Sequence, residues 1–353
     1  MMTESERTFR TNVIIASISS DSGHSNFEIK ESHSYDDLAE KARQDLERPE
    51  YARTFFLGFD LKKTPSNHWY VVEVNGRHTG LQGLERLNPD FSEQQFADSI
   101  RQRYGITFTR HSEILMNGFT EFIGRYPKLQ HVPEEEKLDM SMHIVQACAD
   151  SLKFNEERFE GALVNKINHK NLLPENFIAP FVILDGTQKV RDLRSWIRIV
   201  TSQHPEDFQQ GLVVVKSPTG LQGREVFVHR LHKLTQEQLP IGYMVEPFIK
   251  SALIVYSKDG LAHDGCMRFG IIANIDNDSK VDFTPAGGYW RLSPQSTINT
   301  KTRLKNRYTA NLSRGAFAQN ASEEDVELAR VISEDSALHM FSKFYQREFT
   351  KKS

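Results

Sequence analysis

The sequence predicts an α+β fold, and three observations support this prediction. Short apolar runs typical of sheet strands occur at residues 12–17, 54–61 and 69–74. A capped helix is expected at residues 93–104. From residue 180 onward, strand and helix patterns alternate along the chain. The sequence therefore combines sheets with helices and does not rely on one type of element alone.

The composition limits the classes to which the protein can belong. A chain of 353 residues with 38% hydrophobic and 26% charged residues can bury a sizeable core in two or three subdomains. The net charge of −3, without a basic stripe, argues against a nucleic-acid partner. No apolar run approaches the roughly 20 residues of a bilayer span, so we expect a cytoplasmic protein without a membrane partner. Cys148 and Cys266 lack metal-site spacing and do not indicate a disulfide framework.

The first half of the chain contains two expected helices. Ser92 and Gln95 have the spacing of a capping box for the helix at 93–104. Residues 134–152 carry apolar side chains at helical spacing, whereas residues 130–133 have the composition of a connector. We expect a subdomain boundary near this connector.

The second half is expected to form a compact α+β unit. Strands are predicted at residues 181–184, 212–216, 225–229 and 243–246. Between the first two strands, the spacing of Leu193, Ile197 and Val200 predicts a helix. Ser322 is predicted to cap a final amphipathic helix.

The stretch VVVKSPTGLQGREVFV contains the first candidate site. Lys216 ends an apolar strand, and Gly220 and Gly223 follow in a loop. Such a loop can bring backbone N–H groups close to phosphate oxygens, while the ammonium group supplies the countercharge. The order differs from a P-loop, in which the lysine follows the glycines. A phosphate cradle and an ordinary hairpin fit this stretch equally well.

The second candidate is the strand MVEPFI, which is interrupted by Pro247. Because proline lacks an N–H group, the strand edge cannot be fully paired. Its free amide and carbonyl groups could then contact a planar ligand such as adenine. Taken alone, this pattern is more typical of an ordinary edge strand.

The third candidate is a group of oxygen ligands on two early strands. Glu73 and Asn75 are two residues apart, so their side chains project from the same face of a strand. Asp60 ends the neighbouring predicted strand. These three side chains could meet one Mg²⁺ ion, which prefers carboxylates together with substrate phosphates. The alternative is a solvated strand face.

Together with Lys166 in LVNKINHKNLL, these motifs resemble those of the ATP-grasp superfamily. The resemblance implies that Lys166 and Lys216 hold the phosphates of ATP, with the glycine loop beside them. It assigns adenine to the hinge strand that contains Glu246, Phe248 and Ile249, and Mg²⁺ to Asp60, Glu73 and Asn75. The family often holds the ribose through an acidic residue after the hinge. This chain has Lys250 there, which leaves the ribose contact open.

The order of the motifs differs from that of the family. The Asp and Glu-x-Asn strands usually come last, but here they precede the lysines, so the chain resembles a circular permutation. The resemblance implies two α+β subdomains that sandwich ATP. The expected segments are 1–106 with the metal-binding strands, 107–160 as a helical substrate side, and 161–353 as the central and lid subdomains.

Four arginines lie beside these motifs, namely Arg77, Arg268, Arg291 and Arg314. A planar guanidinium can clamp a carboxylate or an acyl phosphate with two hydrogen bonds. Single arginines are more often structural or surface residues. The neighbouring motifs favour a catalytic role, most of all for Arg268 and Arg291. The 13 histidines show no helical metal-binding pair and are left unassigned.

The resemblance implies a ligase that uses ATP to activate a substrate carboxylate as an acyl phosphate. An amine then attacks this intermediate, with release of ADP and phosphate. Small-molecule or peptide carboxylates and amines would be the substrates. Two alternatives stay open, a kinase on the same nucleotide site and a non-catalytic nucleotide-binding protein. A homodimer is also compatible with the sequence.

Overall fold

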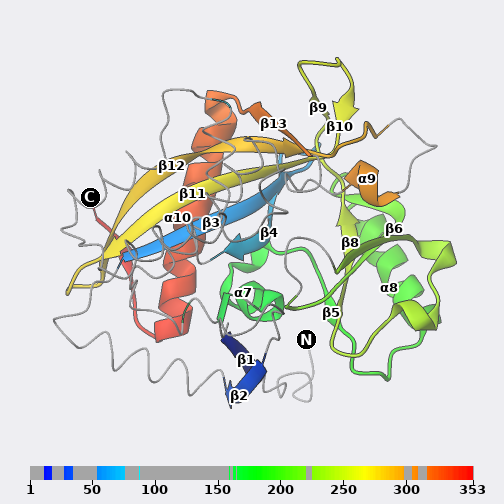
Figure 1. Cartoon of the computed structure of the whole chain (residues 1–353), viewed down its shortest axis with the longest axis horizontal. Helices are drawn as coiled ribbons and strands as arrows, with labels where there is room; N and C mark the ends of the chain where they lie inside the picture. Colours follow the sequence, from blue (N-terminus) through cyan, green and yellow to red (C-terminus); the bar gives the residue numbers. More distant parts are fainter. Residues whose placement is uncertain are drawn as a thin grey trace, which may run out of the picture.

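The computed structural model describes residues 12–17, 28–34, 54–75, 87, 159, 162–163, 165–219, 225–297, 304–308 and 316–352. These residues form a mixed α+β fold built on two main sheets with few helices (Figure 1). Within them, every helix is too short or too polar to cross a bilayer.

The larger sheet has the strand order β13-β12-β11-β3-β4, and β14 pairs with β12. Its strands are β3 (Thr54–Lys63), β4 (Trp69–Asn75), β11 (Gly265–Ile275), β12 (Lys280–Leu292), β13 (Phe317–Asn320) and β14 (Thr350–Lys351). Neighbouring strands are antiparallel except for β14, which runs parallel to β12. The early strand β3 therefore lies between β4 and the much later strand β11.

Helix α10 (Glu323–Tyr345) packs against this sheet and runs across its strands (Figure 1). Its first turn is capped by Ser322, whose side chain accepts a hydrogen bond from the Asp325 N–H, as the sequence predicts. The core beneath it is aromatic. Phe55 lies 4.8 Å from Phe341 and 5.4 Å from Phe159, measured between ring centroids. Each fully buried Phe contributes roughly 1.5 to 3 kcal/mol to stability.

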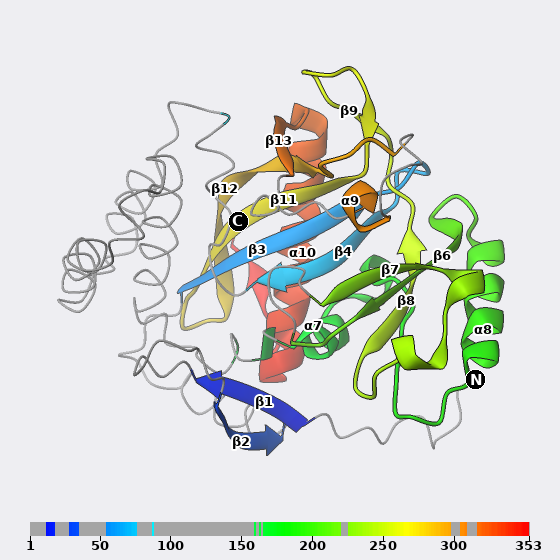
Figure 2. The ribbon, with the colours of Figure 1, turned by 45° about the vertical axis from the view of Figure 1, so that its right-hand side comes forward.

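The smaller sheet has the order β5-β8-β6-β7. It consists of β5 (Val182–Ile183), β6 (Phe208–Lys216), β7 (Val226–Arg230) and β8 (Met244–Ile249), and α8 (Val190–Gln203) packs on one face. Leu193 and Ile197 of the helix meet Val213, Val215 and Val245 of the sheet in a separate apolar cluster. Figure 2 shows α8 on the side of the smaller sheet that faces away from the larger sheet. The opposite face is therefore turned toward the larger sheet.

The remaining elements are short. They are β1 (Asn12–Ser17), β2 (Glu28–Ser34), α7 (Lys166–Leu172), β9 (Ile254–Val255), β10 (Ala262–His263), α9 (Leu304–Tyr308) and the 3₁₀ turns Glu175–Phe177, Leu231–Lys233 and Gln236–Gln238. The pairs β1–β2 and β9–β10 are antiparallel.

The two main sheets are joined at Asp207, which directly precedes β6. Its carboxylate accepts hydrogen bonds from Thr64 Oγ1 at 2.9 Å, Ser66 Oγ at 2.6 Å and the Tyr70 hydroxyl at 3.0 Å. Thr64 and Ser66 lie in the turn between β3 and β4, and Tyr70 lies on β4. Burial opposes the charge of Asp207, but these three donors outweigh it and lower the pKa of the carboxyl. The sheets are therefore fixed to each other at this point.

The strands predicted at residues 12–17, 54–61 and 69–74 are confirmed as β1, β3 and β4. The helices expected at 93–104 and 134–152 lie outside the described residues, as does the boundary near 130–133. Most of the expected segments 1–106 and 107–160 also lies outside them, so this three-part organisation stays a prediction.

Candidate functional site

The register of the larger sheet brings together residues that lie far apart in the sequence. Asp60 on β3 lies directly opposite Glu73 on β4 and opposite Arg268 on β11. Asn75 lies opposite Gly58, and its Nδ2 donates a hydrogen bond to the Gly58 carbonyl at 3.5 Å. Opposed residues of paired strands project from the same face of a sheet. The predicted oxygen ligands therefore share one face.

Two arginines converge on the carboxylate of Asp60. Arg268 Nε lies 2.6 Å from Oδ1, and its Nη2 donates a hydrogen bond to Oδ2 at 3.1 Å. Arg291 Nη2, from β12, lies 2.5 Å from the same Oδ2. All three side chains are largely buried. Both oxygens of Asp60 thus face guanidinium groups.

Glu73 pairs with Lys166 of α7, with 3.4 Å between Nζ and Oε1. The Glu73 side chain is 34% exposed, far more than the other carboxylates of this cluster. Burial alone would raise the pKa of Glu73, but nearby cations outweigh it and lower the pKa. These cations, in decreasing order of effect, are Lys166, Arg268, Lys216 and Arg291. Glu73 is therefore ionised, and it faces solvent more than its neighbours do.

Glu246 of the smaller sheet holds two lysines. Its Oε1 lies 2.7 Å from Lys170 Nζ, and its Oε2 lies 2.9 Å from Lys216 Nζ. Burial lowers the pKa of Lys170 to about 8, against the opposing effect of Glu246. Lys170 was not among the residues predicted from the sequence. The signal that could have found it is its position one helical turn after Lys166.

Local structure explains why these lysines reach the site. Asn165 caps α7 by accepting hydrogen bonds from the backbone N–H groups of Ile167 and Asn168, and this fixes the turn from which Lys166 and Lys170 project. The Lys166 N–H also donates to the Pro218 carbonyl at 2.8 Å, which ties α7 to the segment after β6.

Strand alternation explains the orientation of Lys216 and Glu246. Val215 faces α8, so the adjacent Lys216 points to the opposite face, and Glu246 lies opposite Val214 on that same face. The charged groups of the smaller sheet therefore occupy the face that is turned toward the larger sheet.

Five cations and three carboxylates meet in this cluster. The cations are Lys166, Lys170, Lys216, Arg268 and Arg291, and the carboxylates are Asp60, Glu73 and Glu246. Two positive charges are therefore in excess among these described residues. Because the cations outnumber the carboxylates among these residues, the cluster is suited to bind an anionic ligand.

His169 adds a neutral polar group beside the lysines. Its side chain is fully buried, and Nδ1 lies 3.5 Å from the Leu163 carbonyl. Burial, followed by the charges of Lys170, Lys216 and Lys166, lowers the pKa of His169 well below its usual value. The imidazole therefore contributes no charge to the cluster. Nothing in the sequence pattern marked this residue.

Strand β8, predicted to contact adenine, pairs with β6 along one edge and with β5 at the start of the other. The Phe248 ring packs 4.8 Å from Tyr308 and lies 4.7 Å from Lys62 Nζ, so its side chain is already occupied. Strand β5 pairs with β8 only at Met244 and Val245. The segment from Glu246 to Ile249 extends beyond this pairing and is buried along its whole length.

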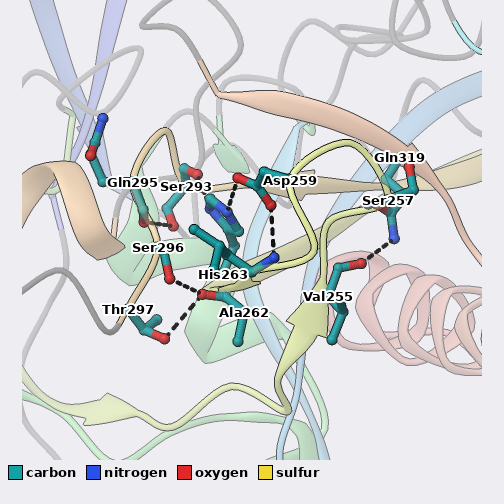
Figure 3. Close-up of polar contacts among 11 residues, drawn as sticks. Val255, Ser257, Asp259, Ala262, His263, Ser293, Gln295, Ser296, Thr297 and Gln319 are labelled. Carbon is teal, nitrogen blue, oxygen red and sulfur yellow. Dashed lines mark hydrogen bonds and ion pairs between the residues drawn. The ribbon is translucent and has the colours of Figure 1, made fainter.

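A second polar network fastens the β9–β10 hairpin (Figure 3). His263 is buried, its Nδ1 donates to the Ser293 carbonyl at 2.8 Å, and its Nε2 lies 3.1 Å from Asp259 Oδ2. The Ser296 hydroxyl donates to the Ala262 carbonyl at 2.7 Å. Asp259, His263 and Ser293 thus meet here. Ser293 contacts the histidine through its backbone carbonyl and not through its hydroxyl, so the group is not arranged for nucleophilic catalysis. This network holds the hairpin in place.

His204, Glu206 and Asp207 also bring three potential metal ligands within 4.8 Å of one another. Asp207 already accepts the three hydroxyl hydrogen bonds described above, and the other two side chains are exposed. Asp207 is explained by its role in joining the sheets, and we assign no metal to this group.

Eight of the predicted site residues lie in or beside the charge cluster, namely Asp60, Glu73, Asn75, Lys166, Lys216, Glu246, Arg268 and Arg291. Phe248 and Ile249 follow on β8. Gly220, Gly223, Arg77 and Arg314 lie outside the described residues. No protein-family model and no curated protein matches this chain, so the geometry of the cluster carries the functional argument.

Proposed function

We propose that this chain is an ATP-dependent ligase of the ATP-grasp type that joins a carboxylate to an amine. The observation that supports this proposal is the excess of two positive charges in the buried cluster between the sheets. A nucleoside triphosphate with one magnesium ion carries a net charge of about −2. Mg-ATP would therefore balance this excess.

The proposed fold is a circularly permuted ATP-grasp arrangement in which the two sheets enclose the nucleotide. Lys166, Lys170 and Lys216 would bind phosphate oxygens. The hinge backbone beyond Val245 would contact adenine. The face of the smaller sheet that carries Lys216 also carries Val214, opposite Val228 on β7, and such apolar side chains suit a planar base.

The proposed metal ligands have suitable chemistry. Asp60 and Glu73 are directly opposed carboxylates, and Asn75 adds an amide oxygen on the same face. Hard oxygen ligands of this kind suit Mg²⁺. The exposure of Glu73 leaves one carboxylate accessible from solvent. Bound Mg²⁺ would supply charge neutralisation on the transferred phosphoryl group.

In the proposed reaction, a carboxylate oxygen of the substrate attacks the γ-phosphorus and ADP leaves. The amine then attacks the carbonyl carbon of the acyl phosphate, phosphate leaves, and the amine loses a proton. The side chains of the cluster position the groups and balance charge, and none of them forms a covalent bond. Burial excludes water, which would otherwise hydrolyse the acyl phosphate. Small-molecule or peptide carboxylates and amines remain the proposed substrates.

The test is nucleotide turnover with Mg²⁺ and a mixed pool of amino acids and small carboxylic acids, with ADP separated from AMP. We expect ADP formation that depends on the pool and is lost in Glu73→Ala. The control variant Glu327→Ala changes an exposed carboxylate on α10 and should retain turnover. AMP formation, or failure of the wild-type protein to bind Mg-ATP in a thermal-shift assay, would contradict the proposal.

Hydroxylamine separates the ligase from a kinase. An acyl phosphate is trapped as a hydroxamate, so turnover with a carboxylate and hydroxylamine should yield this product. A phosphorylated product that survives hydroxylamine would instead identify a hydroxyl acceptor, and the ligase assignment would then be wrong.

A further inference from the structure

We propose that Arg268 and Arg291 form an oxyanion site that Asp60 occupies in the ligand-free protein. A carboxylate or phosphoryl group of the substrate would take this site by displacing Asp60. The existence of the site follows from geometry alone, whereas its use by a substrate rests on the proposed function.

The contacts of Asp60 are those that an external carboxylate would make. Arg268 approaches both oxygens, at 2.6 and 3.1 Å, and Arg291 approaches Oδ2 from the neighbouring strand. A guanidinium fork of this kind matches the spacing of carboxylate and phosphate oxygens. Asp60 therefore acts as an internal ligand of the two arginines.

Asp60 does not use every hydrogen-bond donor of Arg291. Arg291 Nε is buried and lacks a hydrogen-bond partner in the described part of the chain. Arg291 Nη2 also donates to the Sγ of Cys266, at 3.7 Å. Burial raises the pKa of this thiol to about 11, so it stays neutral near physiological pH. Arg291 thus keeps a buried donor for an incoming anion.

The exchange needs mobile arginines and an access route. Asp60 lies on a central strand with β4 on one side and β11 on the other, so its backbone is fixed. The arginines are long side chains that can turn toward a ligand while their strands stay in place. Glu73, directly opposite Asp60, is 34% exposed, which opens the cluster to solvent beside the arginine pair.

The first experiment measures the binding of acetate and of inorganic phosphate to Asp60→Asn, without metal and without nucleotide. Calorimetry should show an affinity at least about tenfold higher than that of the wild-type protein. The anion should also raise the melting temperature of the variant more than that of the wild type. The matched control is Asp192→Asn, which alters an exposed Asp–Arg pair on α8 and should leave anion binding unchanged. In Asp60→Asn combined with Arg291→Gln, the gain should disappear.

The two anions distinguish the two sources of the oxyanion. A larger gain for acetate assigns the site to the carboxyl group of the substrate, and a larger gain for phosphate assigns it to the transferred phosphoryl group. Equal affinity of Asp60→Asn and wild type for both anions would overturn the inference. Asp60, Arg268 and Arg291 would then form a permanent structural ion-pair network.

A second measurement uses the wild-type protein in case Asp60→Asn does not fold. If Asp60 can exchange its arginines for a metal ion, MgCl₂ should raise the affinity of the wild type for the same anion, and Arg291→Gln should remove this increase. An unchanged affinity would count against the inference. Because no nucleotide is present, this result is independent of Mg-ATP binding, which tests the proposed function separately.

Discussion

The two halves of the charge cluster use the same plan with different cations. In the larger sheet, one carboxylate, Asp60, holds the two arginines. On the side of the smaller sheet, one carboxylate, Glu246, holds Lys170 and Lys216. The remaining pair, Glu73 with Lys166, joins β4 to α7. Each half therefore has one positive charge in excess.

The difference between the cations indicates what each half can bind. Guanidinium groups are planar and recognise two oxygens at once, whereas ammonium groups are compact charges that contact phosphate from several directions. The arginine half is thus suited to a planar carboxylate or an acyl phosphate. The lysine half is suited to the phosphate chain of a nucleotide. In the proposed reaction, the two ligands would meet where the halves adjoin, beside Glu73.

The largest expected effect comes from removing the carboxylate of the lysine half. Glu246→Ala leaves two buried ammonium groups without their partner, and the free energy of unfolding should fall by about 3 to 5 kcal/mol. Urea denaturation measures this loss. Glu327→Ala, in an exposed pair with Arg330, should change stability by less than about 1 kcal/mol. If Glu246→Ala lost as little stability as Glu327→Ala, the two lysines would have found other partners.

The next largest effect is expected from a change in the core of the smaller sheet, and it also tests whether the two sheets unfold together. Ile197→Ala opens the core beneath α8 and should cost about 2 to 4 kcal/mol. The Asp207 network joins the sheets, so the fluorescence of Trp196 on α8 and of Trp290 on β12 should change in one transition. Variants that retain a single tryptophan separate the two signals. An earlier transition at Trp196 would mean that the smaller sheet unfolds by itself.

If the chain binds ATP as proposed, Lys170 should make this binding depend on pH. Its pKa is lowered to about 8, so the ammonium charge is lost above this pH and the affinity for ATP should fall by about tenfold between roughly pH 7 and pH 9. Lys170→Arg keeps its charge and should remove this dependence. A dependence that persists in Lys170→Arg would assign the titration to another group.

The same group contributes to stability with a defined sign. The folded pKa of Lys170 lies below its usual value of 10.5, so the folded state binds fewer protons between about pH 8 and 10.5. Its contribution to the free energy of unfolding should therefore rise with pH across this window. Urea denaturation of wild type and Lys170→Arg at both ends of this pH window isolates the contribution of Lys170.

The smallest expected effect concerns the link between the halves. Ser66→Ala removes one of the three hydrogen bonds to Asp207 and should cost about 0.5 to 1.5 kcal/mol. The loss should be greatest above the pKa of Asp207, which its hydrogen bonds lower, and should diminish in acid as the carboxyl is protonated. The neighbouring turn residue Pro65, which is also exposed, offers a control, because Pro65→Ala leaves the Asp207 contacts in place.

Local sequence patterns predicted the elements that are apolar and uninterrupted. The apolar runs within β3, β4 and β6 are of this kind. The capping serine of α10, Ser322, was also predicted. Strand β12 was missed because Pro285, Gly287 and Gly288 are typical of turns, yet they lie within a long antiparallel pair with β11. Helix α7 has only seven residues, too few for a helical period to be recognised.

Sequence patterns singled out residues that the structure brings together, but not the contacts among them. Spacing of two along a strand correctly placed Glu73 and Asn75 on one face. The pairing of Asp60 with Arg268 joins residues separated by 208 positions, and no local pattern carries that information. Lys170 was missed for the related reason that its role depends on Glu246, a distant partner.

The position of β3 between β4 and β11 also has a consequence for synthesis of the chain. Asp60 is translated 208 residues before Arg268, its cross-strand partner. At a typical translation rate, this interval lasts roughly 10 to 40 s. Until β11 emerges from the ribosome, the β3–β4 hairpin must keep one edge of β3 unpaired, and such edges invite association with other chains. The arrangement that completes the site thus makes the nascent protein dependent on protection of that edge.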